Sequence, residues 1–346
     1  MKILINKTKN ATSHSTSWNN PWIAYAEEHG IPYETADLLA CNAIEKLRGT
    51  DCLLWQFGQY RYAQMLETRS ILYSAKLMGI KVFPDYPEAW HFDDKIAEMY
   101  ALQAVGAPIP KSWIFYDMDS LKQNLEKGDF TFPIVAKLRT GSGSHNVKLI
   151  RNRTELLKYA KTMFFKGGFD SSPSLAFKTI SNVRSSHDFK TFMAKVKRAP
   201  EFLRTRRGAK EFPNEKGYVY LQEFIPNDGF DMKVVVVGDK VSGLHRPIRT
   251  NDFRASGGGE TLHDKSLFTK ELIEMVFKTT DALDLQCIGY DVVIDNRNGK
   301  PVIIEMSYGF AHEAVMKLGG YFDRSGIWHD EPLNAPAELL HNMLNQ

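Results

Sequence analysis

The sequence predicts an α/β fold followed by an α+β fold, and three observations lead to this prediction. Up to about residue 90, short apolar runs alternate with segments of helical periodicity. Beyond Lys111, the predicted strands instead come in pairs joined by short turns. Apolar residues make up 43% and charged residues 25% of the 346 positions, which is ordinary for a globular protein and sufficient for more than one core.

The first part of the chain reads as a small domain in which strands alternate with helices. Its predicted strands cover residues 2–6, 51–57 and 80–85, and its predicted helices cover residues 21–29 and 60–78. Strands separated by helices usually pair in parallel, because a parallel connection needs a long crossover. We therefore expect a parallel α/β domain over residues 1–90.

The second part of the chain begins with one helix and continues as strands. The helix is expected over residues 93–105, because two aspartates stand in its first turn and Gly106 ends it. The strands are expected at residues 131–139, 146–150 and 217–225, followed by hairpins at 231–248 and 288–310. We expect a central domain over residues 91–216 and a C-terminal domain over residues 217–346, with mostly antiparallel sheets.

Residues 166–216 form a basic insertion within the predicted central domain. This segment holds twelve Lys and Arg against five Asp and Glu, a local excess of +7. An amphipathic helix is predicted within it from four apolar residues at i, i+3, i+4 and i+7, which are Phe189, Phe192, Met193 and Val196. Two interpretations are open: a surface subdomain with a solvated basic face, or a cover over an anionic substrate or nucleotide.

Charge, cysteines and hydropathy exclude several classes of protein. The net charge of +3 is too small to indicate general binding to nucleic acid or to a membrane. The three cysteines have no metal-binding spacing and no disulfide pattern, which favours a reducing compartment. No apolar run reaches the ~18 residues of a bilayer span, and the N-terminal residues lack the core of a signal peptide. We expect a cytoplasmic protein that neither binds nucleic acid nor inserts into a membrane.

A glycine-rich connection follows the strand predicted at residues 131–139. Lys137 stands near the end of that strand, and two glycines lie in the connection TGSGSHN. Glycine allows backbone N–H groups to turn toward a phosphate, and a lysine adds a positive charge. The spacing matches neither of the common phosphate-loop patterns, so this loop alone is only a weak indication of phosphate binding.

The hairpin at residues 288–310 carries two carboxylates on an otherwise apolar pair of strands. Its turn, at residues 296–299, sets a register that brings Asp291 and Glu305 opposite each other or one position away. Like charges across a strand pair cost on the order of 0.2–1 kcal/mol on a wet surface and more when buried. Ser307 should point to the same side as Glu305, because side chains alternate along a strand.

Three explanations of this carboxylate pair are open. A divalent cation between the two acids would remove the repulsion, and Mg²⁺ is a hard ion that prefers oxygen ligands. Ser307 could then add a hydroxyl ligand. Alternatively, Asp291 lies at a wet strand end and never meets Glu305, or the two acids form a metal-free acid/base dyad. Under the first explanation, removing the charge of Asp291 should not destabilise the metal-free fold.

An ordered set of motifs along the chain resembles the ATP-grasp ligase superfamily. In chain order these are Lys95 in DDKIAEMYAL, Lys137, QEFIP at 222–226, Asp231, HRPIRTNDFRASGGGE at 245–260, Asp291, and ExS at 305–307. The set is most similar to the branch that contains glutathione synthetase and the ribosomal-protein glutamate ligases, and it extends from about residue 80 to 315. The resemblance implies an ATP-grasp fold preceded by a Rossmann-like, pre-ATP-grasp domain.

The resemblance also implies which residues bind ATP. The positions that correspond to phosphate contacts are Lys95, Lys137, Gly141, Ser142, Gly143 and Ser144. The positions that correspond to the adenine-binding segment are Gln222, Glu223, Phe224 and Ile225. Asp231 corresponds to the acidic residue that accepts hydrogen bonds from the ribose hydroxyls.

The same resemblance implies which residues act on the phosphates. Arg254, assisted by Arg246, would face the γ-phosphate and an acyl-phosphate, where negative charge accumulates. Asp291, Glu305 and Ser307 would hold one or two Mg²⁺ ions, with Mn²⁺ as an alternative. Two features depart from the family pattern: Ser307 stands where asparagine is usual, and residues 166–216 are longer than the usual connection.

The function implied by the resemblance is ATP-dependent ligation of a carboxylate to an amine. Such an enzyme forms an acyl-phosphate, then an amide or peptide bond, and releases ADP and phosphate. Its partners would be a small-molecule, peptide or saccharide carboxylate and an amine, and a homodimer is one expected assembly. The alternatives are a kinase of the same fold that phosphorylates a hydroxyl, and a nucleotide-binding protein without turnover. The identity of the two substrates is open.

Overall fold

The computed structural model describes residues 2–7, 17–59, 61–141, 146–171, 212–248 and 261–345. The chain divides into two compact units. Unit 1 consists of Met1–Phe57, Glu67–Lys111 and Phe224–Gln346, and unit 2 consists of Gly58–Leu66 and Ser112–Glu223. One of the boundaries therefore falls between Glu223 and Phe224, inside the segment predicted to meet adenine. The predicted division into domains at residues 90 and 216 stays a prediction.

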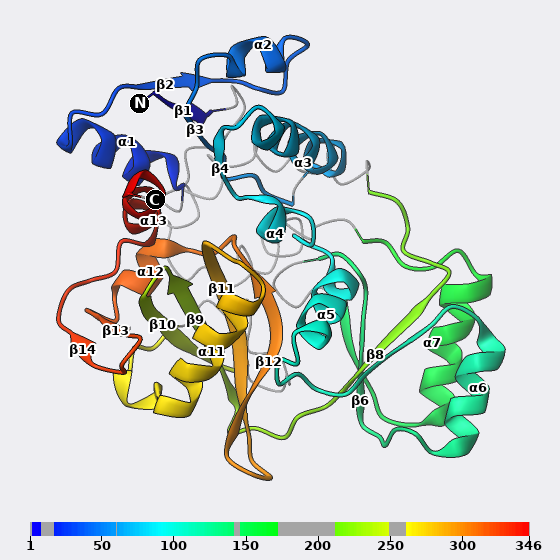
Figure 1. The fold of residues 1–346 in the computed structure, drawn as a ribbon. Helices are drawn as coiled ribbons and strands as arrows, with labels where there is room; N and C mark the ends of the chain where they lie inside the picture. Colours follow the sequence, from blue (N-terminus) through cyan, green and yellow to red (C-terminus); the bar gives the residue numbers. More distant parts are fainter. Residues whose placement is uncertain are drawn as a thin grey trace, which may run out of the picture. The chain divides into compact units, whose positions relative to one another are not determined.

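Unit 1 contains a four-stranded parallel sheet of order β2-β1-β3-β4 (Figure 1). Its strands are β1 (Ile3–Asn6), β2 (Tyr33–Ala36), β3 (Cys52–Leu54) and β4 (Lys81–Phe83). The helices of this part of the chain are α1 (Asn19–Glu28), α2 (Ala43–Leu47), α3 (Tyr62–Leu77) and α4 (Tyr86–Ala89). The predicted parallel α/β arrangement is confirmed, and its three predicted strands are β1, β3 and β4.

The C-terminal part of unit 1 is a six-stranded antiparallel sheet of order β12-β11-β9-β10-β13-β14. Its strands are β9 (Phe230–Val237), β10 (Lys240–Pro247), β11 (Cys287–Asp295), β12 (Lys300–Ser307), β13 (Tyr321–Asp323) and β14 (Trp328–His329). Both predicted hairpins are confirmed, as β9–β10 and β11–β12. Strands β9 and β11 lie inside the sheet and are almost entirely buried, which explains their long valine- and isoleucine-rich runs.

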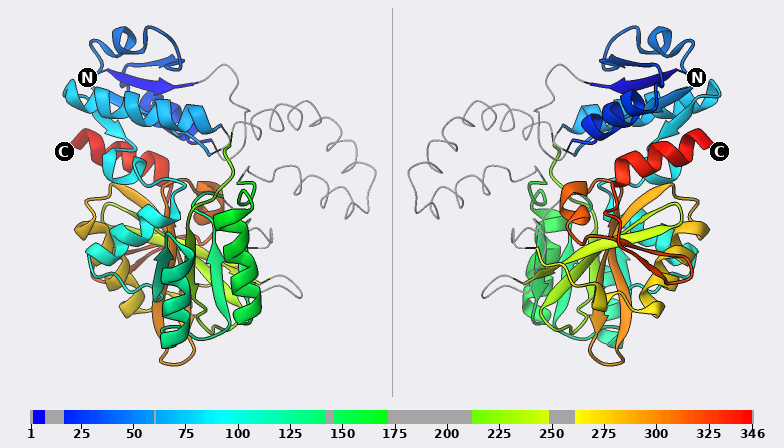
Figure 2. Two further views of the ribbon diagram at one scale, coloured as in Figure 1. Left: turned by 90° about the vertical axis from the view of Figure 1, so that its right-hand side faces the viewer. Right: turned by 90° about the vertical axis from the view of Figure 1, so that its left-hand side faces the viewer.

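Helices cover one face and one edge of this sheet. On the face, α11 (Lys270–Ala282) is joined to β11 by a hydrogen bond between the hydroxyls of Thr280 and Tyr290 at 2.9 Å. At the edge, α5 (Lys95–Ala104) packs against β12, and the backbone N–H of Ile303 donates to the carbonyl of Pro108 at 2.8 Å. The remaining helices are η1 (Lys265–Leu267), α12 (His312–Met316) and α13 (Ala335–Asn345), which packs against α1 (Figure 2).

A buried carboxyl group links the two sheets of unit 1. Glu88 on α4 is fully buried, and one of its oxygens accepts a hydrogen bond from the backbone N–H of Gln286, next to β11. Its other oxygen accepts from the N–H of Asp85, the residue that caps α4. Burial raises the pKa of Glu88 to about 8, so this group is mostly protonated in neutral solution.

Unit 2 contains a four-stranded antiparallel sheet of order β5-β8-β6-β7. Its strands are β5 (Ser112–Phe115), β6 (Ile134–Lys137), β7 (Val147–Ile150) and β8 (Val219–Glu223). The helices α6 (Met118–Lys127) and α7 (Arg153–Phe165) lie side by side on it (Figure 2). The predicted change from parallel to antiparallel pairing after residue 111 is confirmed.

The position of Lys148 shows which face of the unit 2 sheet is turned toward α7. Lys148 on β7 reaches α7, since its ammonium lies 5.6 Å from the centre of the Tyr159 ring. Lys148 is opposite Ala136 in the ladder, so Ala136 also faces α7. Its neighbour Lys137 therefore points to the opposite face of the sheet, away from α7.

Two further predictions concern membrane-spanning helices and the helix of the basic insertion. Among the helices of the described residues, none has both the length and the hydropathy that a membrane crossing needs. The amphipathic helix predicted at residues 189–196 lies outside the described residues, as does most of the basic insertion.

Candidate active site

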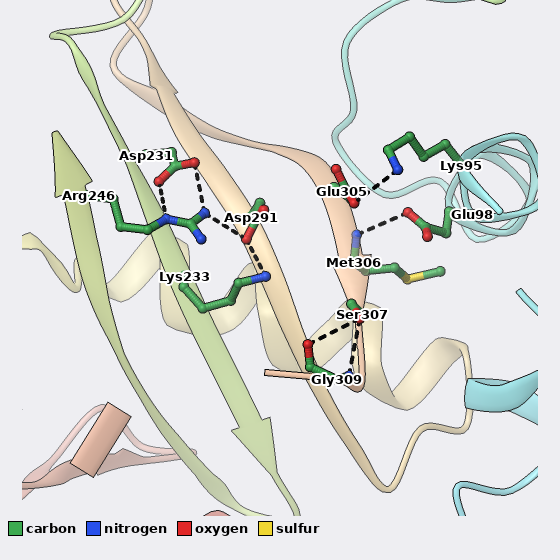
Figure 3. A network of polar contacts seen from close by, with 10 residues as sticks. All are labelled: Lys95, Glu98, Asp231, Lys233, Arg246, Asp291, Glu305, Met306, Ser307 and Gly309. Carbon is green, nitrogen blue, oxygen red and sulfur yellow. Dashed lines mark hydrogen bonds and ion pairs between the residues drawn. The ribbon is translucent and has the colours of Figure 1, made fainter. Parts of the chain in front are cut away.

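One face of the six-stranded sheet carries a row of charged side chains from four adjacent strands (Figure 3). Asp291 on β11 is directly opposite Lys233 on β9, and Asp231 on β9 is directly opposite Arg246 on β10. Glu305 on β12 is directly opposite Asp291. Opposed residues share a face of a sheet, as do alternate residues of one strand, so all five side chains point to the same side. We call this set the charged row.

The predicted register of the hairpin is confirmed, and the alternative of a wet strand end is wrong. Asp291 is paired with Glu305 as predicted, and the ladder is irregular immediately after Asp291, where a β-bulge follows. The side chain of Asp291 is only 9% exposed, so it belongs to the sheet interior. Bulges frequently occur next to active sites, where they redirect a side chain.

Cations of the chain itself offset the charge of Asp291, an explanation that the three sequence-based alternatives did not include. The ammonium of Lys233 forms an ion pair with Asp291, and Nη2 of Arg246 lies 3.1 Å from the same carboxylate. Burial opposes ionisation of Asp291, but Arg246 and Lys233 outweigh this effect and lower its pKa. These ion pairs lead us to expect the opposite of the sequence-based prediction, namely that loss of the Asp291 charge destabilises the metal-free fold.

Arg246 and Asp231 form the most regular ion pair of the charged row. Nε and Nη2 of Arg246 donate to the two carboxylate oxygens of Asp231 at 2.7 and 2.8 Å, a bidentate arrangement. Burial and the negative charge of Asp291 nevertheless raise the pKa of Asp231 to about 6. Both oxygens of Asp231 are thus bonded inside the protein, and its contact with a ribose stays a prediction.

Two residues of α5 contact β12, the edge strand of the sheet. Nζ of Lys95 lies 3.4 Å from Glu305, and Lys95 is only 5% exposed. Burial would lower the pKa of Lys95, but the neighbouring carboxylates, Glu305 foremost, outweigh burial and raise it. Glu98, one turn further along the helix, accepts a hydrogen bond from the backbone N–H of Met306 at 3.4 Å. Helix α5 thus contacts the strand that carries Glu305 and Ser307.

Lys233 and Glu98 contact the strands that carry the predicted site residues, but the motifs do not point to them. Lys233 stands two positions after Asp231 in a strand, and Glu98 stands three positions after Lys95 in a helix. Both spacings place a side chain on the same face as the predicted residue. Periodicity around the motifs was therefore the signal that could have found them.

Asp291, Glu305 and Ser307 fit a Mg²⁺ site that phosphate oxygens would complete. All three offer oxygen donors, and the side chain of Glu305 is 31% exposed and open to a ligand. The hydroxyl oxygen of Ser307 accepts from the N–H of Gly309 at 3.1 Å, which leaves it one lone pair. Within the described ranges, no group of three or more His, Cys, Asp or Glu could hold a metal by itself. The donors therefore fit an ion shared with a substrate, since Mg²⁺ is often held by one or two carboxylates plus phosphates.

In unit 2, the predicted phosphate and adenine positions lie on β6 and β8. Lys137 is buried at the end of β6, opposite Tyr220 on β8. Gln222 shares that face of the sheet, and its amide donates to the hydroxyl of Tyr220 at 3.3 Å. Gly141 has a φ of +118°, a backbone conformation that favours glycine.

The remaining predicted residues fall into two groups. Glu223 ends β8, and Phe224 and Ile225 follow it across the boundary between the units. Four predicted site residues lie outside the described part of the chain, namely Ser142, Gly143, Ser144 and Arg254.

The chain is similar to one sequence family in part of its length and to several solved structures. Residues 176–319 match the sequence model of the RimK-like ATP-grasp domain. A RimK-domain ATP-grasp protein from Sphaerobacter thermophilus has a similar structure, with a TM-score of 0.54 over 99% of this chain and 100% of that chain, at 13% identity. The chain has the ATP-grasp fold.

Other structures with a similar fold extend this result. They include D-alanine–D-alanine ligase from Bacillus anthracis, with a TM-score of 0.58 at 14% identity over 99% of this chain and 95% of that chain. D-cycloserine synthetase DcsG has a TM-score of 0.57 at 12% identity over 100% of this chain and 99% of that chain. No curated protein matches the chain in sequence. The resemblance to the ATP-grasp superfamily and the predicted ATP-grasp fold are thus confirmed, while the Rossmann-like character of the N-terminal domain stays a prediction.

Proposed function

We propose that the protein is an ATP-dependent carboxylate–amine ligase that forms an acyl-phosphate and releases ADP and phosphate. The charged row carries this proposal. On one sheet face, Lys233 pairs with Asp291, Arg246 pairs with both Asp231 and Asp291, and Lys95 pairs with Glu305 from α5. Such a face offers oxygen ligands for a cation and donors for phosphate oxygens, and it needs no nucleophilic side chain. Other proteins of this fold are ligases, which supports the proposal.

Under this proposal, the acids and the cations near the charged row have different tasks. Asp291, Glu305 and Ser307 would hold one or two Mg²⁺ ions, or Mn²⁺, and a bound ion would neutralise charge on the phosphates. Arg246 and Lys233 stand beside Asp291, where they would donate to phosphate oxygens. Arg254 would assist at the γ-phosphate, as the sequence predicts.

The nucleotide contacts are proposed on the residues that the motifs identify. Lys95 and Lys137, both buried, would contact phosphates together with Gly141–Ser144, and Asp231 would bind the ribose. The segment from Gln222 to Ile225 would meet adenine. A small-molecule, peptide or saccharide carboxylate and an amine would be the other substrates, and a cytoplasmic location and a homodimer are proposed with them.

Trapping with hydroxylamine tests the proposal. The full-length protein is incubated with ATP, Mg²⁺, hydroxylamine and pools of carboxylic acids, and hydroxamate and ADP are measured. Hydroxylamine replaces the unknown amine, so only the acid has to be found. We expect hydroxamate and ADP in equal amounts with one class of acid. ADP without hydroxamate that depends on an added hydroxyl compound would instead establish a kinase, and nucleotide binding without any ADP would indicate a protein that lacks turnover.

The variant Arg246→Lys tests whether the guanidinium fork is required. Lysine keeps the positive charge but cannot bond both oxygens of Asp231 and also reach Asp291. We expect the rate of ADP formation to fall by about 100-fold, the lower end of the loss caused by removing one positioned donor at a developing charge, because lysine keeps the positive charge. The matched control is Arg297→Lys, which alters a bidentate pair with Asp295 in the turn between β11 and β12. Full activity of Arg246→Lys would show that only the charge matters.

A further inference from the structure

A partly buried network joins the chain segment after β6 to the segment before β8 in unit 2. The hydroxyl of Thr140 donates to Oε1 of Glu215 at 3.0 Å. The hydroxyl of Tyr218 donates to Oε2 of Glu215 at 2.9 Å and accepts from the backbone N–H of Arg139 at 2.6 Å. Both oxygens of Glu215 and both hydrogen-bonding roles of the Tyr218 hydroxyl are thereby used. We call these four residues the Glu215 network.

The surroundings make the Glu215 network strong. Thr140 is 7% exposed and Tyr218 is 4% exposed, so water competes little for their hydroxyls. Burial, together with the charge of Glu215, raises the pKa of Tyr218 far above its usual range, so the hydroxyl keeps its proton. Hydrogen bonds to a carboxylate are stronger than those between neutral groups.

Glu215 itself is held in place by the backbone. It pairs with Phe169 in an antiparallel bridge, with N–O distances of 3.0 and 2.9 Å. A Cβ atom on Gly168 would lie 1.9 Å from the carbonyl oxygen of Glu215, so the two chain segments approach as closely as glycine allows. The ring of Phe169 stacks on Tyr159 of α7 with centroids 5.1 Å apart. The Glu215 network is therefore anchored to a helix.

We infer that Glu215 and Tyr218 are positioning residues for nucleotide binding, which act by fixing the backbone at Arg139 and Thr140 next to Lys137. The inference rests on the proposed function, because it assigns Lys137 to a nucleotide phosphate. A segment that is held before a ligand arrives loses less conformational freedom on binding, and this increases affinity. The network joins residues 75 positions apart in the sequence, so it orders the strand end without any local motif.

The variants Tyr218→Phe and Thr140→Val test this inference in the full-length protein. Each removes one hydroxyl of the Glu215 network and leaves the rest of the side chain in place. We expect the Kd for Mg·ATP, measured by calorimetry, to rise about tenfold in each, the change that corresponds to one lost buried hydrogen bond. Thr140→Ser keeps the hydroxyl and should bind as the wild type does. Amide hydrogen exchange, measured without nucleotide, should be faster at Arg139 in Tyr218→Phe.

The control variant is Tyr159→Phe, in which a phenol of the same unit is removed. Among the described residues, the buried hydroxyl of Tyr159 has no hydrogen-bond partner, so its loss should change neither ATP affinity nor exchange at Arg139. Faster exchange at Arg139 with an unchanged Kd would overturn the inference, because the network would then be structural only. Equal loss of affinity in Tyr159→Phe and Tyr218→Phe would also overturn it. If the wild type itself bound no ATP, the proposed function would fail and the inference with it.

Discussion

In the variant Asp291→Asn, ATP turnover is expected to fall by a factor of about 100 or more. A neutral amide offers a weaker ligand to Mg²⁺ at the position opposite Glu305, and the ion is worth several kcal/mol of charge stabilisation in such reactions. The measurement is ADP release at saturating Mg·ATP with the acid found by hydroxylamine trapping. Asp295→Asn is the matched control, because this aspartate lies on the same strand but pairs with Arg297 in the turn. Retained turnover in Asp291→Asn would exclude Asp291 as a metal ligand.

The same variant should also lose stability in metal-free buffer. Asp291 is 9% exposed and Lys233 is 13% exposed, so the substitution leaves a largely buried ammonium without its partner. Removing one member of a buried ion pair typically costs about 3–5 kcal/mol, and we expect about 3 kcal/mol because Asn keeps one acceptor oxygen. Denaturant unfolding with EDTA measures this loss.

A second substitution separates the ion pair from general damage. Adding Lys233→Met to Asp291→Asn removes the unpaired cation, so part of the lost unfolding free energy should return. Equal stability of wild type and Asp291→Asn without metal would contradict the ion pairs of Asp291 described above.

The second large expected effect is a decrease in folding stability with rising pH, caused by the buried carboxyl group of Glu88. The pKa of this buried carboxyl is about 8 in the folded protein, against an ordinary value of 4.5. Between these two values the folded state binds more protons than the unfolded state, so stability decreases as pH rises. Because of Glu88, the unfolding free energy should decrease by about 1.4 kcal/mol per pH unit in this range. The stabilisation that its raised pKa provides at low pH is lost completely above about pH 8.

The variant Glu88→Gln isolates this contribution. Glutamine keeps an acceptor for the N–H of Gln286 but cannot ionise, so the unfolding free energy should vary less with pH from 4.5 to 8 than in the wild type. At pH 8.5 the variant should be the more stable protein. Glu126→Gln, on an exposed side chain of α6, is the matched control and should keep the wild-type slope. Parallel curves for wild type and Glu88→Gln would show that Glu88 does not carry the pH dependence.

Many helices and strands of the fold are specified by local sequence, so they could be predicted from apolar periodicity and turn residues. The hairpin β11–β12 follows from two apolar runs around a turn cluster, and its register brought Asp291 and Glu305 together as predicted. Strand β2 gave no such signal, because its sequence YETA lies at the sheet edge with exposed and half-exposed residues and lacks an apolar run. Periodicity detects burial, so an element with little burial escapes it.

What the sequence alone determined is the set of elements, the carboxylate pair and the order of the ATP-grasp motifs. What only the tertiary structure decided is the partner of each charge. Lys233 and Arg246 come to Asp291 from β9 and β10, which lie some 40 to 60 positions away in the chain, and Glu215 reaches Thr140 across 75 positions. The pattern of apolar residues along the chain indicates which residues are buried. The energy of a buried charge depends instead on the side chain that lies opposite it on a neighbouring strand. That partner is supplied by strand pairing between distant segments, and ion pairs therefore stand where the sequence alone indicated only repulsion.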